Sequence, residues 1–365
     1  TEADRLLSVK VNIGVGGARD IRPHAMRSQR GLVLTTQELL QVRQTLIAAR
    51  ELSRTIIRLA DDYPRLADVA QRIDPCVGVV NAIGQAVEDS GEIKNSASSE
   101  LARIRRELDV VHNRLQEKLN RILNSAAVSP YLQEVLVTQR AGRYVIPVKS
   151  DFKGRVRGVV HDQSASGATV FVEPLATVEL NNRWRKLQLD EEDEIRRILA
   201  DLSNQVGTQA DFIAHTIEAL AELDLAFAKA KYGYAIDAIE PNLIAADEQG
   251  DQLKLLSARH PLLPEKTVVP IDLELDEHIR MLVITGPNTG GKTVSLKTVG
   301  LLTAMAQSGL RIPAAEGSSL RIFRQIFADI GDEQSIEQSL STFSAHMTNI
   351  VQILTQCDAD SLVIF

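Results

Sequence analysis

The chain has 365 residues with a formal net charge of −7, and 44% of them are hydrophobic, so it is long enough for two or three domains with real cores. The acidic balance excludes a uniformly basic nucleic-acid-binding protein, and no apolar run approaches the roughly 20 residues of a membrane span. The two cysteines lie far apart and match no metal-ligand spacing, which favours ordinary thiols in a cytoplasmic setting.

Residues 1–92 are predicted to form the first part of a helical core, because Leu, Ile, Val, Ala and long charged side chains dominate a chain with only 4% aromatic residues. A long helix is predicted to start at Thr36 as its N-cap, with Glu38 in the first turn, and to end near Pro64. Shorter helices are predicted at 64–72 and 79–89.

Residues 93–128 are predicted to form a long helix with a narrow apolar stripe. The stripe steps by three or four residues through Leu101, Ile104, Leu108, Val111, Leu115, Leu119 and Ile122. Such a stripe needs a partner, and a second one is found at 177–206. It is interrupted by the acidic stretch 190–194, which we expect to weaken it. The two helices are predicted to form an antiparallel coiled coil that carries the enclosed segment at its tip.

The enclosed segment, residues 129–176, is predicted to be a small β-rich module. Apolar runs at 135–138 and 144–148 flank Arg140-Ala141-Gly142-Arg143, which indicates a hairpin, and runs at 158–161 and 168–172 flank a polar Ser/Gly loop. Positive charge is concentrated here, and a solvated hairpin without function is the simpler alternative to phosphate binding. The residues predicted to bind nucleic-acid phosphates are Arg140, Arg143, Lys149, Lys153, Arg155 and Arg157.

Residues 207–246 are predicted to complete the helical core, with a helix at about 209–236. Residues 247–365 are predicted to form an α/β domain. Its strands are expected at 253–256, 281–285, 325–328 and 361–365, and its helices at 291–307 and 342–355.

A complete Gly-x-x-x-x-Gly-Lys-Thr motif stands between the expected strand 281–285 and the following helix. Its residues are Gly286, Pro287, Asn288, Thr289, Gly290, Gly291, Lys292 and Thr293. The glycines let backbone N–H groups close around phosphate oxygens, Lys292 can contact the outer phosphates, and the Thr293 hydroxyl can ligate Mg²⁺. The motif therefore predicts a site for ATP and Mg²⁺.

A second polar constellation follows at 329–335 and 339–347. Its Ser/Thr cluster opens a predicted helix, so the hydroxyl and N–H groups could meet an anion, although helix capping alone explains such a cluster. His346 by itself indicates a packed or surface histidine rather than a catalytic one.

Several long motifs together resemble the MutS family of DNA-repair ATPases, in the branch of the second bacterial MutS paralogue. The resemblance runs from about Asp20 to Phe365. The stretches that carry it are 286–293, 329–335, 341–347, 258–263, 143–149, 160–169 and 178–182.

The resemblance implies a multidomain α and α/β fold with a helical core, an antiparallel coiled-coil lever, a β-rich clamp and an ABC-type P-loop ATPase domain. It further implies a homodimer through the ATPase domains, in which Ser341, Thr342 and Ser344 complete the partner's nucleotide site. Nucleotide state would then open or close the clamps around DNA. By the same resemblance, the function is suppression of homologous recombination on branched DNA at the bacterial nucleoid, with an endonuclease in a C-terminal domain.

The sequence departs from that family pattern after Phe365. It stops on an apolar strand of the kind that precedes the acidic Walker B pair, and no nuclease domain follows. We therefore expect these 365 residues to bind nucleotide, to hydrolyse it poorly and to cut no DNA.

Two other functions compete with DNA clamping. One is a ribosome-directed ATPase that acts on collided ribosomes, because phosphate-directed cations do not distinguish rRNA from DNA. The other is a structural coiled-coil ATPase of chromosomes. That class is disfavoured because its coiled coil follows the phosphate loop and because its Leu-Ser-Gly-Gly signature is missing here.

Overall fold

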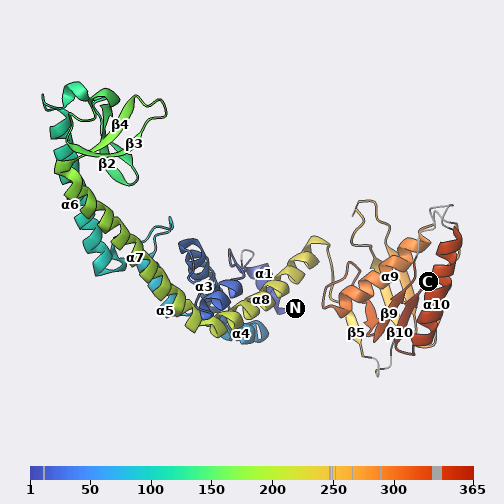
Figure 1. Cartoon of the computed structure of the whole chain (residues 1–365). Coiled ribbons are helices and arrows are strands. Elements are labelled where there is room, and N and C mark those ends of the chain that lie inside the picture. Colours follow the sequence, from blue (N-terminus) through green and yellow to red (C-terminus); the bar gives the residue numbers. More distant parts are fainter. Residues whose placement is uncertain are drawn as a thin grey trace. The chain divides into compact units, whose positions relative to one another are not determined.

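The computed structural model describes residues 1–10, 13–245, 248, 250, 252–264, 266–287, 290–330 and 339–365, without the side chains of 339–345. Its chain divides into two compact units (Figure 1). Residues 15–58 and 68–220 form the first, which we call the tip unit. Residues 1–14, 59–67 and 221–365 form the second, which we call the phosphate-loop unit. Within the described residues, no helix combines the length and apolar character that a membrane span requires.

Helices dominate the tip unit. They are α2 (Arg22–Gln29), α3 (Thr36–Ile57), α5 (Val77–Ala86), α6 (Ser99–Leu123) and α7 (Val178–Thr208), with α4 (Pro64–Gln71) and α8 (Ala210–Ala235) each shared with the phosphate-loop unit. The N-cap of α3 is Thr35 rather than the predicted Thr36, because Thr35 and Glu38 form a reciprocal capping box. Helix α2 crosses α7 at Gly207, where a Cβ atom would lie 2.7 Å from the backbone of Ser28.

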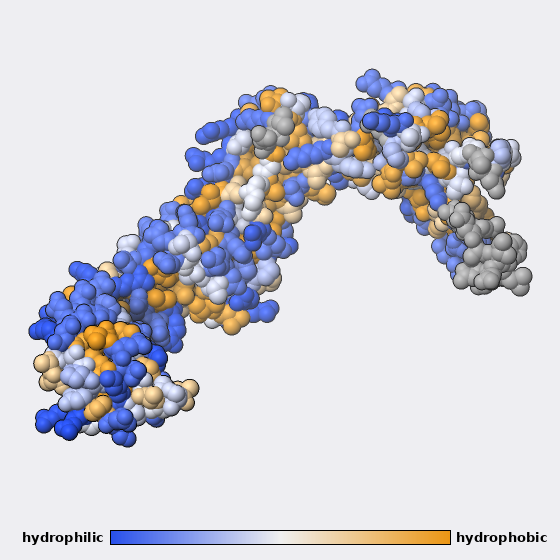
Figure 2. Space-filling model, turned by 90° about the horizontal axis from the view of Figure 1, so that it is seen from above, coloured by the Kyte–Doolittle hydropathy of each residue, from blue (hydrophilic) through white to orange (hydrophobic). Residues whose placement is uncertain are grey.

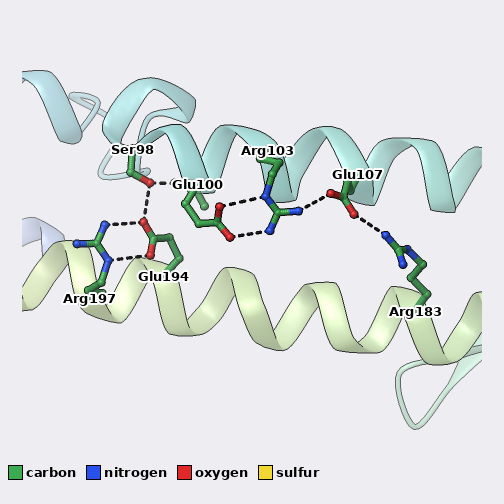
Figure 3. A network of polar contacts seen from close by, with 8 residues as sticks. Ser98, Glu100, Arg103, Glu107, Arg183, Glu194 and Arg197 are labelled. Atoms are coloured by element: carbon green, nitrogen blue, oxygen red, sulfur yellow. Dashed lines mark hydrogen bonds and ion pairs between the residues drawn. The ribbon is translucent and has the colours of Figure 1, made fainter.

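Helices α6 and α7 lie side by side in opposite directions (Figures 1 and 3). Ile104, Leu108, Val111 and Leu187 are buried between them, with Trp184 packed against this cluster. Ion pairs run along the same contact. Figure 3 shows Arg183 of α7 joined to Glu107 of α6 at 2.7 Å, and Arg105 of α6 also lies 2.7 Å from Glu191 of α7.

The acidic stretch 190–194 interrupts the apolar stripe of α7, and its contacts with α6 are polar ones. Glu194 is buried in the contact, and it accepts hydrogen bonds from Ser98 at 2.6 Å and from Arg197 at 2.7 Å (Figure 3). Ser98 is also the N-cap of α6, where its hydroxyl accepts from the N–H of Leu101. A buried polar contact of this kind favours one register of the two helices, because a slipped pairing would separate the Glu194 carboxylate from Ser98 of the other helix.

Replacing Glu194 with alanine is expected to lower the free energy of unfolding at pH 7 by about 1 to 2 kcal/mol, since the Ser98 hydroxyl and the Arg197 guanidinium each lose a hydrogen bond to its carboxylate. The Arg197 guanidinium lowers the pKa of Glu194 from 4.5 to about 2. This carboxylate therefore contributes stability above pH 4.5 that is lost as the pH falls toward 2, and the effect of Glu194→Ala should shrink over that range.

Urea unfolding followed through Trp184, the only tryptophan in the chain, measures this effect. Glu192→Ala is the matched control, because Glu192 is an exposed neighbour on the same helix. Equal shifts of the urea midpoint for the two variants would contradict the proposed register contact.

A four-stranded sheet, which we call the tip sheet, follows α6 and precedes α7 (Figure 1). Its strands are β1 (Thr138–Arg140), β2 (Arg143–Lys149), β3 (Gly158–Gln163) and β4 (Thr169–Pro174), in the order β1-β2-β4-β3 with all neighbours antiparallel. The predicted hairpin at 140–143 is confirmed, with Ala141 and Gly142 both at positive φ as a two-residue turn requires. The first strand of that hairpin starts at Thr138, three residues later than predicted.

The tip sheet covers the carboxyl end of α6. Leu115, Leu119 and Leu123 of that helix are buried against the sheet. The strands contribute Ile146, Val148, Val170 and Val172, and the loops Leu132 and Val156. The apolar stripe read from the sequence therefore has two partners, since its first half packs on α7 and its second half on the sheet.

The phosphate-loop unit combines two sheets with helices. One sheet has the order β5-β8-β6-β7 and the other is the parallel pair β9 and β10. Their bounds are β5 (Asn242–Ile244), β6 (Leu253–Ala258), β7 (Ile271–Leu275), β8 (Ser319–Arg321), β9 (Gln325–Ala328) and β10 (Ser361–Ile364). The helices that lie wholly in this unit are α1 (Glu2–Val9), α9 (Lys292–Gln307) and α10 (Ser339–Gln356). The strands predicted at 253–256, 325–328 and 361–365 are confirmed.

The strand predicted at 281–285 was wrong. The segment has no regular structure, and Met281 and Val283 are 80% and 73% exposed. No described strand pairs with it. An apolar run becomes a strand only where a neighbouring strand supplies hydrogen-bonding partners, and here none does.

Candidate phosphate loop and nucleic-acid interface

The described residues of the Gly-x-x-x-x-Gly-Lys-Thr motif lead directly into α9. Gly286 and Gly291 have φ values of 147° and 76°, a region that residues with a Cβ rarely adopt. Gly291 is the N-cap of α9. The N–H of Gly290 donates to the carbonyl of Pro287 at 3.0 Å, while Asn288 and Thr289 lie outside the described residues.

Lys292 and Thr293 are placed by the first turn of α9. Lys292 is the first residue of the helix, and its ammonium donates to the carbonyl of Gly286 at the other end of the turn. Thr293 follows it and is exposed. A helix N-terminus favours negative charge through its free N–H groups and its dipole, so these residues together suit a phosphate group.

The first turn of α9 is held by packing behind it. Val299, Leu302, Met305 and Ala306 are buried in the core of the phosphate-loop unit. Gly300 lies against β10, where an added Cβ would come within 2.9 Å of Ile364. The loop therefore stands on a helix whose position is fixed by a β-strand.

A magnesium ion fits this site only together with a nucleotide. Thr293 offers a single hydroxyl oxygen, and among the described residues no cluster of three or more His, Cys, Asp or Glu side chains could hold a metal. Magnesium prefers six oxygen ligands and often takes several of them from phosphates and water.

The structure describes only part of the second polar constellation, residues 329–335 and 339–347. Ser341, Thr342 and Ser344 fall in the first turns of α10, and their side chains lie outside the described structure, as do residues 331–338. His346, on the next turn of the helix, lies 2.9 Å from Asp329. This pair connects α10 to the residue that follows β9, so His346 is a packed histidine, one of the two alternatives that the sequence left open.

Two of the six predicted phosphate-binding cations are engaged within the tip sheet. Arg143 donates two hydrogen bonds to Glu173, at 2.9 and 3.0 Å, and one to Asn182 at 2.7 Å. The guanidinium of Arg140 lies 3.3 Å from Asp162 and 4.1 Å from the ring centre of Phe171. Both arginines hold the tip sheet together in this structure.

The other four cations lie together in one short segment. Lys149 ends β2, Arg157 immediately precedes β3, and Lys153 and Arg155 lie in the connection between these strands. All four side chains are exposed, and none forms an ion pair with another residue of the described structure. Positive charge without an internal partner is available for phosphate groups.

The structure adds an aromatic pair that the sequence reasoning missed. Phe152, between Lys149 and Lys153, is exposed, and its ring centre lies 5.2 Å from that of Tyr131. An exposed aromatic ring beside cations can stack on a base of single-stranded nucleic acid. The sequence did contain a sign of this pair, because Phe152 is a phenylalanine inside a Lys/Arg-rich segment. Figure 2 shows strongly hydrophilic residues around a small hydrophobic patch on the tip.

The chain is similar to known proteins along its whole length. Residues 282–365 match the family model described as MutS domain V. The chain is 47% identical over 368 residues to "Endonuclease MutS2" of Halalkalibacterium halodurans, and 49% identical over 373 residues to the protein of that name from Thermomicrobium roseum. Each comparison covers 100% of this chain, but only 46% and 47% of the relatives. The chain thus spans about half the length of the curated relatives it matches.

Proposed function

The chain belongs to the MutS family, in the branch of the proteins named Endonuclease MutS2, and from this premise we propose that it is part of an ATP-dependent DNA clamp. In this proposal it acts on branched recombination DNA at the nucleoid and so suppresses homologous recombination. Because the relatives are about twice as long, we propose the endonuclease activity in their name for a domain that these 365 residues do not include.

The proposed nucleotide site is the phosphate loop, residues 286–293. The support is local geometry, since Gly286 and Gly291 adopt positive φ and the first turn of α9 presents Lys292 and Thr293. ATP would place its outer phosphates against Lys292 and a magnesium ion against Thr293. In the proposed homodimer, Ser341, Thr342 and Ser344 of a second copy approach these phosphates.

The observation that carries the nucleic-acid part is the group of exposed cations Lys149, Lys153, Arg155 and Arg157. They lie within nine consecutive residues of a chain whose net charge is −7. Random placement of charge on an acidic protein does not favour such a cluster, whereas a surface that neutralises phosphates requires it.

The helix pair α6 and α7 is the proposed lever between nucleotide and clamp. Its support is the two ion pairs and the Ser98 hydrogen bond that cross from one helix to the other, because they oppose sliding of the two helices. A change in the phosphate-loop dimer on ATP binding would then move the tip sheets and change their hold on DNA.

Binding of the intact protein to a four-way DNA junction, to plain duplex and to ribosomes, with and without ATP, tests the proposal. We expect the junction to bind more tightly than duplex and its affinity to change with ATP. A preference for ribosomes over both DNA ligands would instead favour the ribosome-directed ATPase. Equal affinities that do not respond to ATP would refute an ATP-dependent clamp.

A further inference from the structure

Three of the stretches that carry the family resemblance, 143–149, 160–169 and 178–182, meet where α7 joins the tip sheet. No part of the proposed nucleotide or phosphate contacts uses this joint. We propose that Asn181 of α7 is a positioning residue that holds the tip sheet in one orientation on the helix pair. The predicted effect of this joint on the affinity for nucleic acid rests on the proposed function, whereas the contacts that form the joint do not.

Asn181 takes the place of a neighbouring strand for one residue of β2. Its side chain is fully buried. The amide oxygen accepts from the backbone N–H of Tyr144 at 2.9 Å, and the amide nitrogen donates to the carbonyl of the same residue at 3.0 Å. Strand β4 pairs with β2 only from Ile146 onward, so the amide satisfies backbone groups that would otherwise be buried without partners.

A second chain of contacts runs from Asn182 across the sheet. Asn182 accepts from Arg143 of β2, and Arg143 donates to Glu173 of β4, which is only 1% exposed. His161 of β3 lies 2.5 Å from the same carboxylate. Three of the four strands are thereby tied to the start of α7 by charge-assisted hydrogen bonds, which are shorter and stronger than neutral ones.

Helix α6 closes the joint from the other side. The hydroxyl of Tyr144 lies 3.0 Å from Nδ1 of His112 on α6. The ring centres of His112 and Tyr144 lie 5.2 and 5.7 Å from that of Trp184 on α7. Tyr144 is therefore held through its backbone by one helix and through its side chain by the other, an arrangement that opposes swivelling of the sheet.

The joint sets the direction of the exposed cations, because Lys149 ends the same strand that Asn181 holds. A tip that swivels must lose that freedom when it binds, so loosening the joint should weaken binding. It should leave the number of phosphate contacts unchanged. The affinity at fixed salt then reports how firmly the joint holds the tip, whereas the salt slope reports the number of phosphate contacts.

Asn181→Ala in the 365-residue chain tests the joint. We expect the fluorescence of Trp184, the only tryptophan of the chain, to shift to longer wavelength as its surroundings loosen, with unchanged far-UV circular dichroism. Affinity for a duplex should fall about three- to tenfold at fixed salt, with the same slope of log affinity against log salt. Asn204→Ala removes an exposed asparagine of α7 and serves as the control. It should change neither the Trp184 emission nor the affinity for the duplex.

Asn181→Ser keeps one hydroxyl in place of the two groups of the amide and adds no buried charge, so it should give intermediate changes in both measurements. It also replaces the alanine variant if that variant loses helix content. Unchanged Trp184 emission in both variants overturns the joint, and a flattened salt slope overturns its positioning role. If the unaltered protein binds no nucleic acid, the proposed function fails, while the Trp184 shift still decides whether Asn181 holds the joint.

Discussion

Lys292→Ala is expected to reduce the affinity for ATP by about ten- to a hundredfold, because a charge-assisted hydrogen bond contributes about 1.5 to 3 kcal/mol. The ammonium is the only cation of the motif, and it stands at the first turn of α9, opposite the carbonyl of Gly286. Equilibrium binding of a fluorescent ATP analogue measures the loss. The thermal shift that ATP produces should shrink in parallel, since ligand stabilisation scales with occupancy.

Lys297→Ala is the matched control, since Lys297 is an exposed lysine of the same helix just beyond the phosphate loop. It removes an equal charge from α9 while leaving the loop intact. Comparable losses of ATP affinity in both variants would mean that general positive charge, and not the loop contact, holds the nucleotide. Full ATP affinity in Lys292→Ala would remove the phosphate loop from the proposed site.

Reversing the charges of Arg155 and Arg157 to glutamate is expected to weaken nucleic-acid binding at least about tenfold and to reduce its salt slope by about two. Both side chains are exposed, and neither has an ion-pair partner in the described structure, so the change should act on the ligand and not on the fold. The loss should be similar for all duplex sequences, because phosphate contacts carry no base information. Fluorescence anisotropy titrations at several salt concentrations provide both quantities.

Arg54→Glu with Arg58→Glu gives the same change in net charge at exposed positions of another part of the tip unit. This control should leave the salt slope unchanged. A selective loss for one DNA sequence in the Arg155 and Arg157 variant would argue against a phosphate-directed tip. A slope equal to that of the unaltered protein would exclude these two residues from the contact.

Patterns that act over a few residues were readable from the sequence alone. The apolar stripe of 101–122 fixed one face of α6, the Ala141-Gly142 turn fixed the first hairpin, and the glycines at 286 and 291 marked a turn with positive φ. Each of these depends on residue spacing or on the conformational freedom of one residue, which neighbouring residues along the chain largely decide.

Tertiary structure decided the partners of the polar side chains. Arg143 belonged to the cationic group by sequence, yet its partner Glu173 lies thirty positions away on another strand. The acidic stretch 190–194 interrupts the apolar stripe of α7 but supplies polar contacts to α6, and the apolar run 281–285 has no neighbouring strand among the described residues. Asn181 stood in a stretch that carries the family resemblance, but its contact partner was not known until the fold placed Tyr144 beside it. A buried polar group is stable only with a partner, and that partner is supplied by packing between segments whose separation along the chain conveys nothing about their distance in space.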